Sequence, residues 1–300
     1  MIHSDLAEGC FGDRKILLHF FEENVKREAP FVVLLHGVHG CASPAEGNKY
    51  GYLCRILAMH GFPACICESS RKNRNRDPFG EDSSAWARHA FQGKTFPMEV
   101  FDACVSLAAA RQKYPGRRVV LWGFSLGGLI AVLLAGRETE RFTLSAGFRE
   151  PDFGAVDGLV LSGSGDEIRP EARSALSLPV LDTLGDPACI SLAASKSRLV
   201  CALFFYGSED KSFSEESCRR IYGKIPLAEG KKQFVVIPGA DHAFRKMKGL
   251  PSREALDLMG SLTTATLGRF LPGTASRVLR EGQPSTPGQG RGRGGGHPFA

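Results

Sequence analysis

The sequence lacks any long uninterrupted hydrophobic run, although 43% of its 300 residues are hydrophobic. No apolar stretch reaches the roughly 18 residues of a membrane-spanning helix without a charge or a glycine break. The first ten residues, MIHSDLAEGC, also lack the basic segment followed by an apolar one that marks a secretory signal. We therefore expect no membrane span and no secretory signal, and a cytoplasmic location.

The sequence also lacks a regular cysteine framework. Its nine cysteines are odd in number, are irregularly spaced and include no CxxC pair. Several lie inside apolar runs, as Cys65 and Cys67 do in PACICES, where alternation places both on one face of a strand. This usage predicts free thiols in a reducing compartment, and it argues against a disulfide scaffold and against a cysteine metal site.

A strong excess of one charge is missing from most of the chain. The formal net charge is +6, and the segment from Pro272 onward holds four arginines against one glutamate. The rest is only mildly basic, so bulk charge does not indicate a specific nucleic-acid partner. Residues 272–300 are rich in Gly, Pro and Arg and almost free of apolar residues, which predicts a disordered tail.

What the chain does contain is an alternation of short apolar runs and helical patterns. Runs typical of strands occur at 15–22, 31–37, 62–69, 118–123, 156–165, 198–207 and 232–239, and helical patterns at 49–61, 97–116, 126–136, 214–225 and 252–271. Such alternation predicts an α/β domain, residues 1–271, with a mostly parallel sheet covered by helices on both faces.

One strand–helix junction carries a chemical motif. The segment GFSLGG places Ser125 between Gly123 and Gly127, after an apolar strand and before a helix. This is the nucleophile-elbow pattern, in which the serine occupies a strained turn and small flanking residues let the strand and helix backbones come close. The helix N-terminus behind the serine favours developing negative charge. We predict that Ser125 is a nucleophile.

A serine hydroxyl needs a base and an orienting acid, expected in the order Ser, Asp or Glu, His. His242, in IPGADHAF after the last strand, is the predicted base, because His297 lies in the tail. Asp210, in GSEDKSF, is the favoured acid because its strand immediately precedes the strand that bears the histidine. Asp166 is the alternative and Glu209 a weaker one. Asp241 is expected to shape the turn beside the histidine.

An oxyanion hole needs two backbone amides aimed at the developing charge. Leu126, directly after the nucleophile, is one predicted donor. Val38, in the loop HGVHG after an early strand, is the other. His36 is expected to orient that loop rather than to transfer protons.

These motifs occur together as LLHGVHG, GFSLGG, YGSED and IPGADHAF, in that order, and they resemble the α/β-hydrolase superfamily over about Lys15 to Leu271. The GADHAF segment is similar to small carboxylesterases of the cinnamoyl/feruloyl-esterase and dienelactone-hydrolase groups. The resemblance implies the α/β-hydrolase fold with a small cap at about 166–197. It also implies a Ser125–His242–Asp210 triad, Val38 and Leu126 as oxyanion donors, and hydrolysis of a small-molecule ester or thioester with no metal or organic cofactor.

The loop ESSRKNRNRDPFG departs from the pattern of the resembling proteins, because it holds Arg71, Lys72, Arg74 and Arg76 at the expected active-site edge. It is either a solvated charged loop or a device that attracts an acidic substrate, such as a carboxylate, phosphate or CoA ester. Downstream, QGKTF around Lys94 lacks the leading glycine and preceding strand of a phosphate-binding loop.

Alternatives to an esterase stay open at this point. A serine triad does not choose its acceptor, so peptidase or acyltransferase activity is a rival within enzymes. A catalytically silent hydrolase scaffold used as a binding module is a rival of another class. The sequence does not indicate the oligomeric state.

Overall fold

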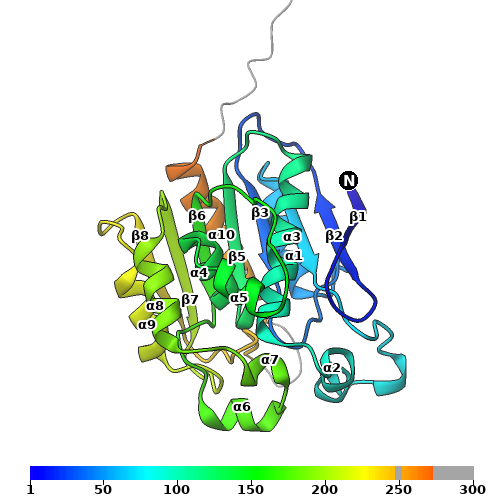
Figure 1. Cartoon of the computed structure of the whole chain (residues 1–300). Coiled ribbons are helices and arrows are strands. Elements are labelled where there is room, and N and C mark those ends of the chain that lie inside the picture. The colour runs from blue at the N-terminus through cyan, green and yellow to red at the C-terminus, as the bar shows by residue number, and fades with distance from the viewer. Residues whose placement is uncertain (247–251, 273–300) are drawn as a thin grey trace, which may run out of the picture.

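A computed structural model describes residues 1–246 and 252–272. Its sheet has eight strands in the spatial order β1-β2-β4-β3-β5-β6-β7-β8 (Figure 1). β2 pairs antiparallel with β1 and β4, and the other pairs are parallel. The strands are β1 (Ile2–Glu8), β2 (Lys15–Phe21), β3 (Phe31–Leu35), β4 (Ala64–Glu68), β5 (Val119–Phe124), β6 (Gly158–Ser162), β7 (Cys201–Gly207) and β8 (Lys232–Ile237).

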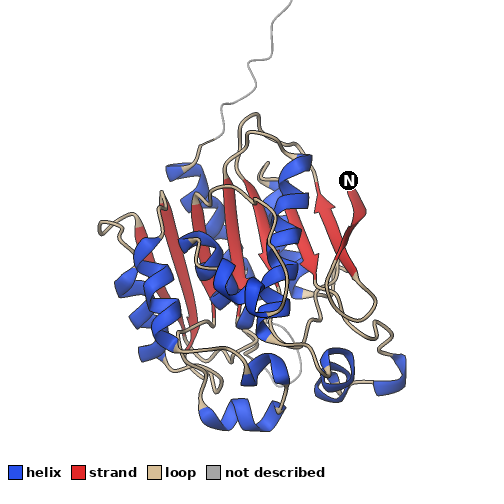
Figure 2. Ribbon diagram, in the orientation of Figure 1, coloured by secondary structure: helices blue, strands red, loops and turns tan. Residues whose placement is uncertain are grey.

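Helices cover both faces of this sheet (Figure 2). They are α1 (Lys49–Met59), η1 (Asp77–Phe79), α2 (Ser83–Phe91), α3 (Phe96–Lys113), α4 (Leu126–Gly136), α5 (Glu140–Ser145), α6 (Pro170–Leu176), α7 (Pro179–Asp182), α8 (Pro187–Lys196), α9 (Glu215–Lys224) and α10 (Arg253–Phe270). Apolar residues of α1 and α10 share one core cluster, and those of α3, α4, α8 and α9 share the other. The expected α/β architecture is therefore confirmed.

The central strands show why their sequences read as continuous apolar runs. In β3, Phe31, Val33 and Leu35 enter the core on one face, while Val32 and Leu34 enter the core on the other. Both faces of a parallel sheet are covered by helices, so neither set of alternating side chains meets water. All five residues of this strand are buried.

Several elements were not predicted from the sequence. β1 is an edge strand whose residues are mostly exposed, so it carries no apolar signal. α2 and α5 are short, and the mixed stretch 166–197 divides into the three helices α6, α7 and α8. α6 and α7 lie beyond one end of the sheet, at the bottom of Figure 1, whereas α8 packs on α4. The helix expected at 97–116 runs from Phe96 to Lys113.

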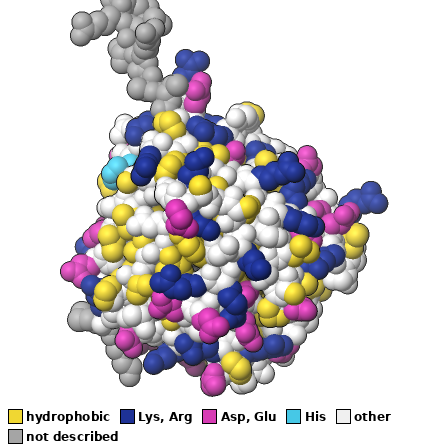
Figure 3. Space-filling model, turned by 90° about the vertical axis from the view of Figure 1, so that its left-hand side faces the viewer, with side chains coloured by type: hydrophobic (Ala, Val, Ile, Leu, Met, Phe, Trp, Pro, Cys, Tyr) yellow, Lys and Arg dark blue, Asp and Glu magenta, His cyan; other side chains and the backbone are white. Residues whose placement is uncertain are grey.

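Other expectations concern the molecule as a whole. The nine cysteines form no disulfide, as predicted. Among the described residues no helix is long and apolar enough to cross a membrane, and no group of metal-ligating side chains is found. On the face in Figure 3, positive and negative side chains are interspersed. The predicted tail beyond Pro272 lies outside the described residues.

Candidate active site

The parallel strands bring the motif residues to one edge of the sheet. Ser125 directly follows β5, Asp210 lies in the loop after β7, and His242 lies in the loop after β8. The carboxyl ends of parallel strands share an edge, where ligand sites of α/β proteins gather. Residues 117 positions apart thereby come within hydrogen-bond distance.

Ser125 adopts the backbone conformation that the elbow pattern predicts. Its φ is 53° and its ψ −121°, a combination that non-glycine residues rarely occupy. It is the N-cap of α4, and its amide donates to Ser162 O at 3.0 Å. The turn holds Ser125 between the end of a buried strand and the start of a buried helix, so the strained residue is fixed from both sides.

The flanking glycines are required by close backbone approach. A Cβ on Gly123 would lie closer than 3.0 Å to Gly127 O and Gly128 Cα. A Cβ on Gly127 would lie closer than 3.0 Å to the carbonyl oxygens of Leu35 and His36. Real Cβ atoms do not tolerate such distances to backbone atoms, which supports the predicted reason for small residues here.

A hydrogen-bonded chain links the three predicted catalytic residues. His242 Nε2 lies 3.0 Å from Ser125 Oγ, and His242 Nδ1 lies 2.8 Å from Asp210 Oδ2. The other oxygen of Asp210 accepts from the amides of Ser212 and Phe213 at 2.7 and 3.0 Å. Phe213 also stacks on the imidazole, with ring centroids 5.8 Å apart. The acid is thus anchored to its own loop while it holds the histidine.

The other acidic residues considered are engaged elsewhere. Asp166 is buried and forms a two-pronged ion pair with Arg220, at 2.9 Å from Nε and 2.7 Å from Nη2. Asp241 accepts from the amides of Ala243 and Arg245 at 2.9 and 2.8 Å, so it shapes the turn beside His242 as expected. Among the described residues, the carboxylate that contacts His242 is therefore that of Asp210 and not that of Asp166.

The loop after β3 lies against the serine. A Cβ on Gly37 would be 3.1 Å from Ser125 Cβ, so this glycine lets the loop backbone approach the nucleophile. The next amide, that of Val38, donates to no other described residue. Leu126 is the first residue of α4, where backbone amides have no partner within the helix. Both predicted oxyanion donors therefore have free amides beside Ser125.

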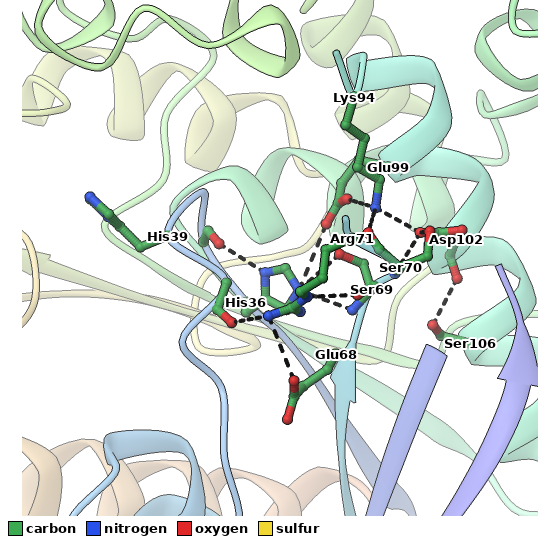
Figure 4. Close-up of polar contacts among 12 residues, drawn as sticks. His36, His39, Glu68, Ser69, Ser70, Arg71, Lys94, Glu99, Asp102 and Ser106 are labelled. Carbon is green, nitrogen blue, oxygen red and sulfur yellow. Dashed lines mark hydrogen bonds and ion pairs between the residues drawn. The ribbon is translucent and has the colours of Figure 1, made fainter. Parts of the chain in front are cut away.

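His36 and His39 point to opposite sides of this loop (Figure 4). His36 is buried; its Nδ1 donates to Gly37 O at 2.8 Å, and its Nε2 accepts from Ser69 N at 3.2 Å. Burial lowers the pKa of His36 below its ordinary value, which favours this neutral form. His36 therefore braces the loop, in keeping with its expected orienting role, while His39 lines the cavity described below.

A buried ionic network continues behind His36 (Figure 4). Arg71 donates to Gly40 O at 2.7 Å and to Ser69 O at 3.0 Å, so it fixes the far end of the loop. Lys94 lies 2.5 Å from Glu99 and 2.7 Å from Asp102, which also accepts from Ser70. Paired and hydrogen-bonded charges of this kind hold segments in one arrangement when buried.

A cavity of about 580 Å³ opens beside Ser125. Its apolar lining includes Phe124, Phe213, Ile168 from the loop before α6, Ala172 from α6 and Leu181 from α7. The other residues that line it are Gly37, Val38, His39, Gly40, Cys41, Gly47, Asn48, Lys49, Tyr50, Arg76, Ser83, Ser125, Ser162, Ser212, His242, Ala243 and Arg245. The volume lies in the range of small-molecule sites.

Of the four basic loop residues considered as substrate contacts, only Arg76 lines this cavity. Arg71 is 1% exposed and belongs to the buried network. Arg74 is paired with Asp13 at 2.6 Å and with Glu68 at 3.2 Å. Lys72 is exposed, with its Nζ 5.9 Å above the Phe11 ring. An irregular loop has no periodicity from which these directions could be predicted.

Sequence reasoning missed two cations of the cavity. Lys49 is the first residue of α1, and Arg245 lies three residues after His242. The one signal in the sequence was their position. Lys49 follows the loop after β3, and Arg245 lies in the loop after β8 that carries His242. Neither belongs to a motif.

Comparisons with known proteins bear on the fold. The family described as alpha/beta hydrolase fold matches residues 67–146. No curated protein sequence matches the chain. Solved structures that resemble it include the esterase domain of a Rhodothermus marinus protein, with 15% identity, a TM-score of 0.55, and 90% of this chain and 99% of that chain covered.

Two further structures resemble the chain at similar levels. A putative dienelactone hydrolase from Klebsiella pneumoniae is 16% identical, with a TM-score of 0.60 and coverage of 90% of this chain and 100% of that one. A soluble variant of monoglyceride lipase from Saccharomyces cerevisiae is 14% identical, with a TM-score of 0.61 and coverage of 90% and 95%. With its mixed eight-stranded sheet and helices on both faces, the chain has the α/β-hydrolase fold.

Proposed function

We propose that this protein is a serine hydrolase that cleaves a carboxylic ester or thioester of a small molecule. The observation that carries the proposal is the hydrogen-bonded chain from Ser125 Oγ through His242 to Asp210, at the wall of a cavity of about 580 Å³. The esterase, dienelactone hydrolase and lipase among the structural neighbours favour an ester over an amide as the bond that is cleaved.

The proposed reaction has two halves. His242 Nε2 accepts the Ser125 proton as Oγ attacks the ester carbonyl, and the imidazolium then protonates the departing alcohol or thiol. Water, activated by the same nitrogen, attacks the acyl-serine and releases the acid. Asp210 holds Nδ1 protonated and stabilises the imidazolium, since its 2.8 Å contact to Nδ1 leaves Nε2 as the base.

Charge that develops on the carbonyl oxygen is stabilised by the amides of Val38 and Leu126. Both donors are backbone groups, so they need no rearrangement during the reaction. The contacts of His36 and Arg71 with the carbonyls of Gly37 and Gly40 hold the Val38 amide in place from behind. α6 and α7 form the cap proposed for 166–197, and their apolar side chains accommodate the acyl chain or the alcohol.

A fluorophosphonate probe tests the nucleophile. We expect covalent labelling of the wild-type protein, loss of labelling in Ser125→Ala, and unchanged labelling in Ser208→Ala, an exposed serine of the β7 loop. A panel of p-nitrophenyl esters, feruloyl esters, acyl-CoAs and peptide anilides then tests the reaction. Absence of both labelling and turnover in folded protein would favour the binding module, and faster cleavage of anilides would favour the peptidase.

A further inference from the structure

The charged lining of the cavity has one sign. Lys49, Arg76 and Arg245 all line it, and the described lining residues include no aspartate or glutamate. The three cations come from separate segments: the start of α1, the loop before η1, and the loop after β8. Three positive side chains that share a space with the proposed nucleophile call for a negative group within that space.

Arg76 has no anionic partner in the described part of the chain. Its guanidinium lies over the Trp86 ring, 5.1 Å from the centroid, and its Nε is buried without a hydrogen-bond acceptor. A buried donor without an acceptor costs free energy, so the site gains when a ligand supplies one. A planar guanidinium backed by an aromatic ring is well suited to a carboxylate or a phosphate group.

Lys49 is likewise without an ion pair among the described residues. Its Nζ lies 4.9 Å from the centroid of the Phe124 ring and 5.2 Å from that of Tyr50. Burial lowers the pKa of Lys49 to about 8, while the negative charge of Asp241 opposes that shift. Phe124 precedes Ser125 directly, so the ammonium lies close to the proposed nucleophile.

Arg245 contributes less to the positive potential, because its guanidinium pairs with Asp241 at 2.9 Å. His39 lies on the cavity side of the loop that follows β3 and carries Val38, called the oxyanion loop below. Burial first, and with it the positive charges of Lys49, Arg76 and Arg245, lower the pKa of His39 to about 4. The cavity thus holds two cations that lack an anionic partner among the described residues, and a third that is partly neutralised.

We propose that the ester hydrolysed by this protein carries an anionic substituent, a carboxylate or phosphate, which Arg76 and Lys49 bind. The proposal rests on the proposed function, since it places the anion and the reacting ester in the same cavity of about 580 Å³. That volume suits a single small molecule that bears both groups. The proposal assigns recognition of the substrate's anionic group to Arg76 and Lys49, which lie outside the catalytic motifs.

Matched esters test the substituent. The acyl series comprises three 4-nitrophenyl esters. The ester of glutaramic acid is neutral, the monoester of glutaric acid bears a carboxylate, and the ester of 4-phosphonobutyric acid bears a phosphonate. The alcohol series is the butyrate esters of 4-hydroxybenzamide and 4-hydroxybenzoic acid. We expect kcat/KM at pH 7 to be about tenfold or more higher for an anionic member than for its neutral partner in at least one series. The carboxylate and phosphonate arms distinguish the two sources of charge.

Neutralising variants test the residues. In Arg76→Gln and in Lys49→Met, the ratio of kcat/KM for the anionic ester to that for its neutral partner should fall about tenfold. In Lys72→Gln the ratio should keep its wild-type value, because Lys72 lies in the same basic loop but outside the cavity lining. An equal fall of the ratio in Lys72→Gln would mean that the preference comes from long-range charge rather than from direct contact, and it would overturn the assignment.

A binding measurement separates this proposal from the proposed function. In Ser125→Ala, calorimetry compares monomethyl glutarate and its phosphonate counterpart with the neutral methyl glutaramate. Preferential binding of an anion that disappears in Ser125→Ala/Arg76→Gln supports the proposal even where no ester is turned over. Ser125-dependent turnover with no anionic preference in either series, and equal binding of all three ligands, would overturn it while leaving the esterase intact.

Discussion

The two carboxylate oxygens of Asp210 have different kinds of partner. One oxygen contacts His242 and the other accepts two amides of its own loop. An amide in its place presents an NH₂ group to one of these partners and favours the wrong imidazole tautomer. We therefore predict that Asp210→Asn lowers kcat about 10³- to 10⁴-fold in a steady-state ester assay.

Asp166→Asn is the control for that prediction. Asp166 follows the neighbouring strand and is also buried, but it pairs with Arg220. Its replacement should affect unfolding far more than kcat. A loss of kcat in Asp166→Asn comparable with that in Asp210→Asn would show that the acid has been misassigned.

Lys49 makes the anionic preference depend on pH. With a pKa of about 8, its charge is largely present at pH 7 and largely absent at pH 9. We predict that the ratio of kcat/KM for the glutarate ester to that for the glutaramate ester falls several-fold, to about a third or less, between these values. The ratio cancels the titration of the catalytic groups, because both esters use them equally.

The arginine variant checks the origin of that fall. Arginine keeps its charge throughout this range, so Lys49→Arg should retain the preference at pH 9. A decline of the same size in Lys49→Arg would point to another titrating group near the cavity.

At the scale of elements, the site depends on how closely the oxyanion loop, β5 and α4 approach one another. Gly127 lies where α4 crosses the carbonyls of Leu35 and His36. We predict that Gly127→Ala displaces α4 from β3, with a loss of about 2 kcal/mol or more in the free energy of unfolding measured in urea. Ester turnover should fall with it, because Ser125 and Val38 would move apart.

Gly268→Ala, in α10, is the matched control. A Cβ on Gly268 meets nothing within 4 Å. Alanine is favoured over glycine inside a helix, so this variant should gain about 0.5–1 kcal/mol and keep full activity. Similar destabilisation in both variants would contradict the assignment of the Gly127→Ala loss to the close approach of α4 and β3.

At the scale of the whole molecule, the buried network joins the sheet edge to α3. Lys94 precedes α3, lies at 0% exposure and pairs with Glu99 and Asp102. Asp102 in turn accepts from the amides of Ser70 and Cys10. Removal of one member of a buried ion pair leaves an uncompensated charge. We predict that Lys94→Met costs about 3–5 kcal/mol in urea unfolding at pH 7.

The exposed Lys231→Met provides the comparison, since surface lysines contribute little to stability. It should shift the unfolding free energy by less than about 0.5 kcal/mol. A mild effect of Lys94→Met, equal to that of Lys231→Met, would show that Glu99 and Asp102 do not need their cation.

Much of the fold was predictable from local pattern. Strands such as β3 and β5 are buried on both faces, so their apolar runs are unambiguous, and the glycines after them mark the edge that holds the proposed active site. β1 was missed because its exposed residues leave no apolar signal. The contacts of Lys94 were missed because a buried lysine reads as an exposed one until its partners are placed.

The local sequence specified the strand–turn–helix at Ser125 and the order of the serine, acid and histidine, because backbone sterics and short-range periodicity act over a few residues. It favoured Asp210 over Asp166 by strand order alone and left Asp166 as an alternative, since both follow neighbouring strands. Nor did it distinguish Arg76, which faces the cavity, from Arg71, which braces the loop behind it. Those distinctions depend on the packing of distant segments such as α1, α2 and β8, and no periodicity within an irregular loop encodes them.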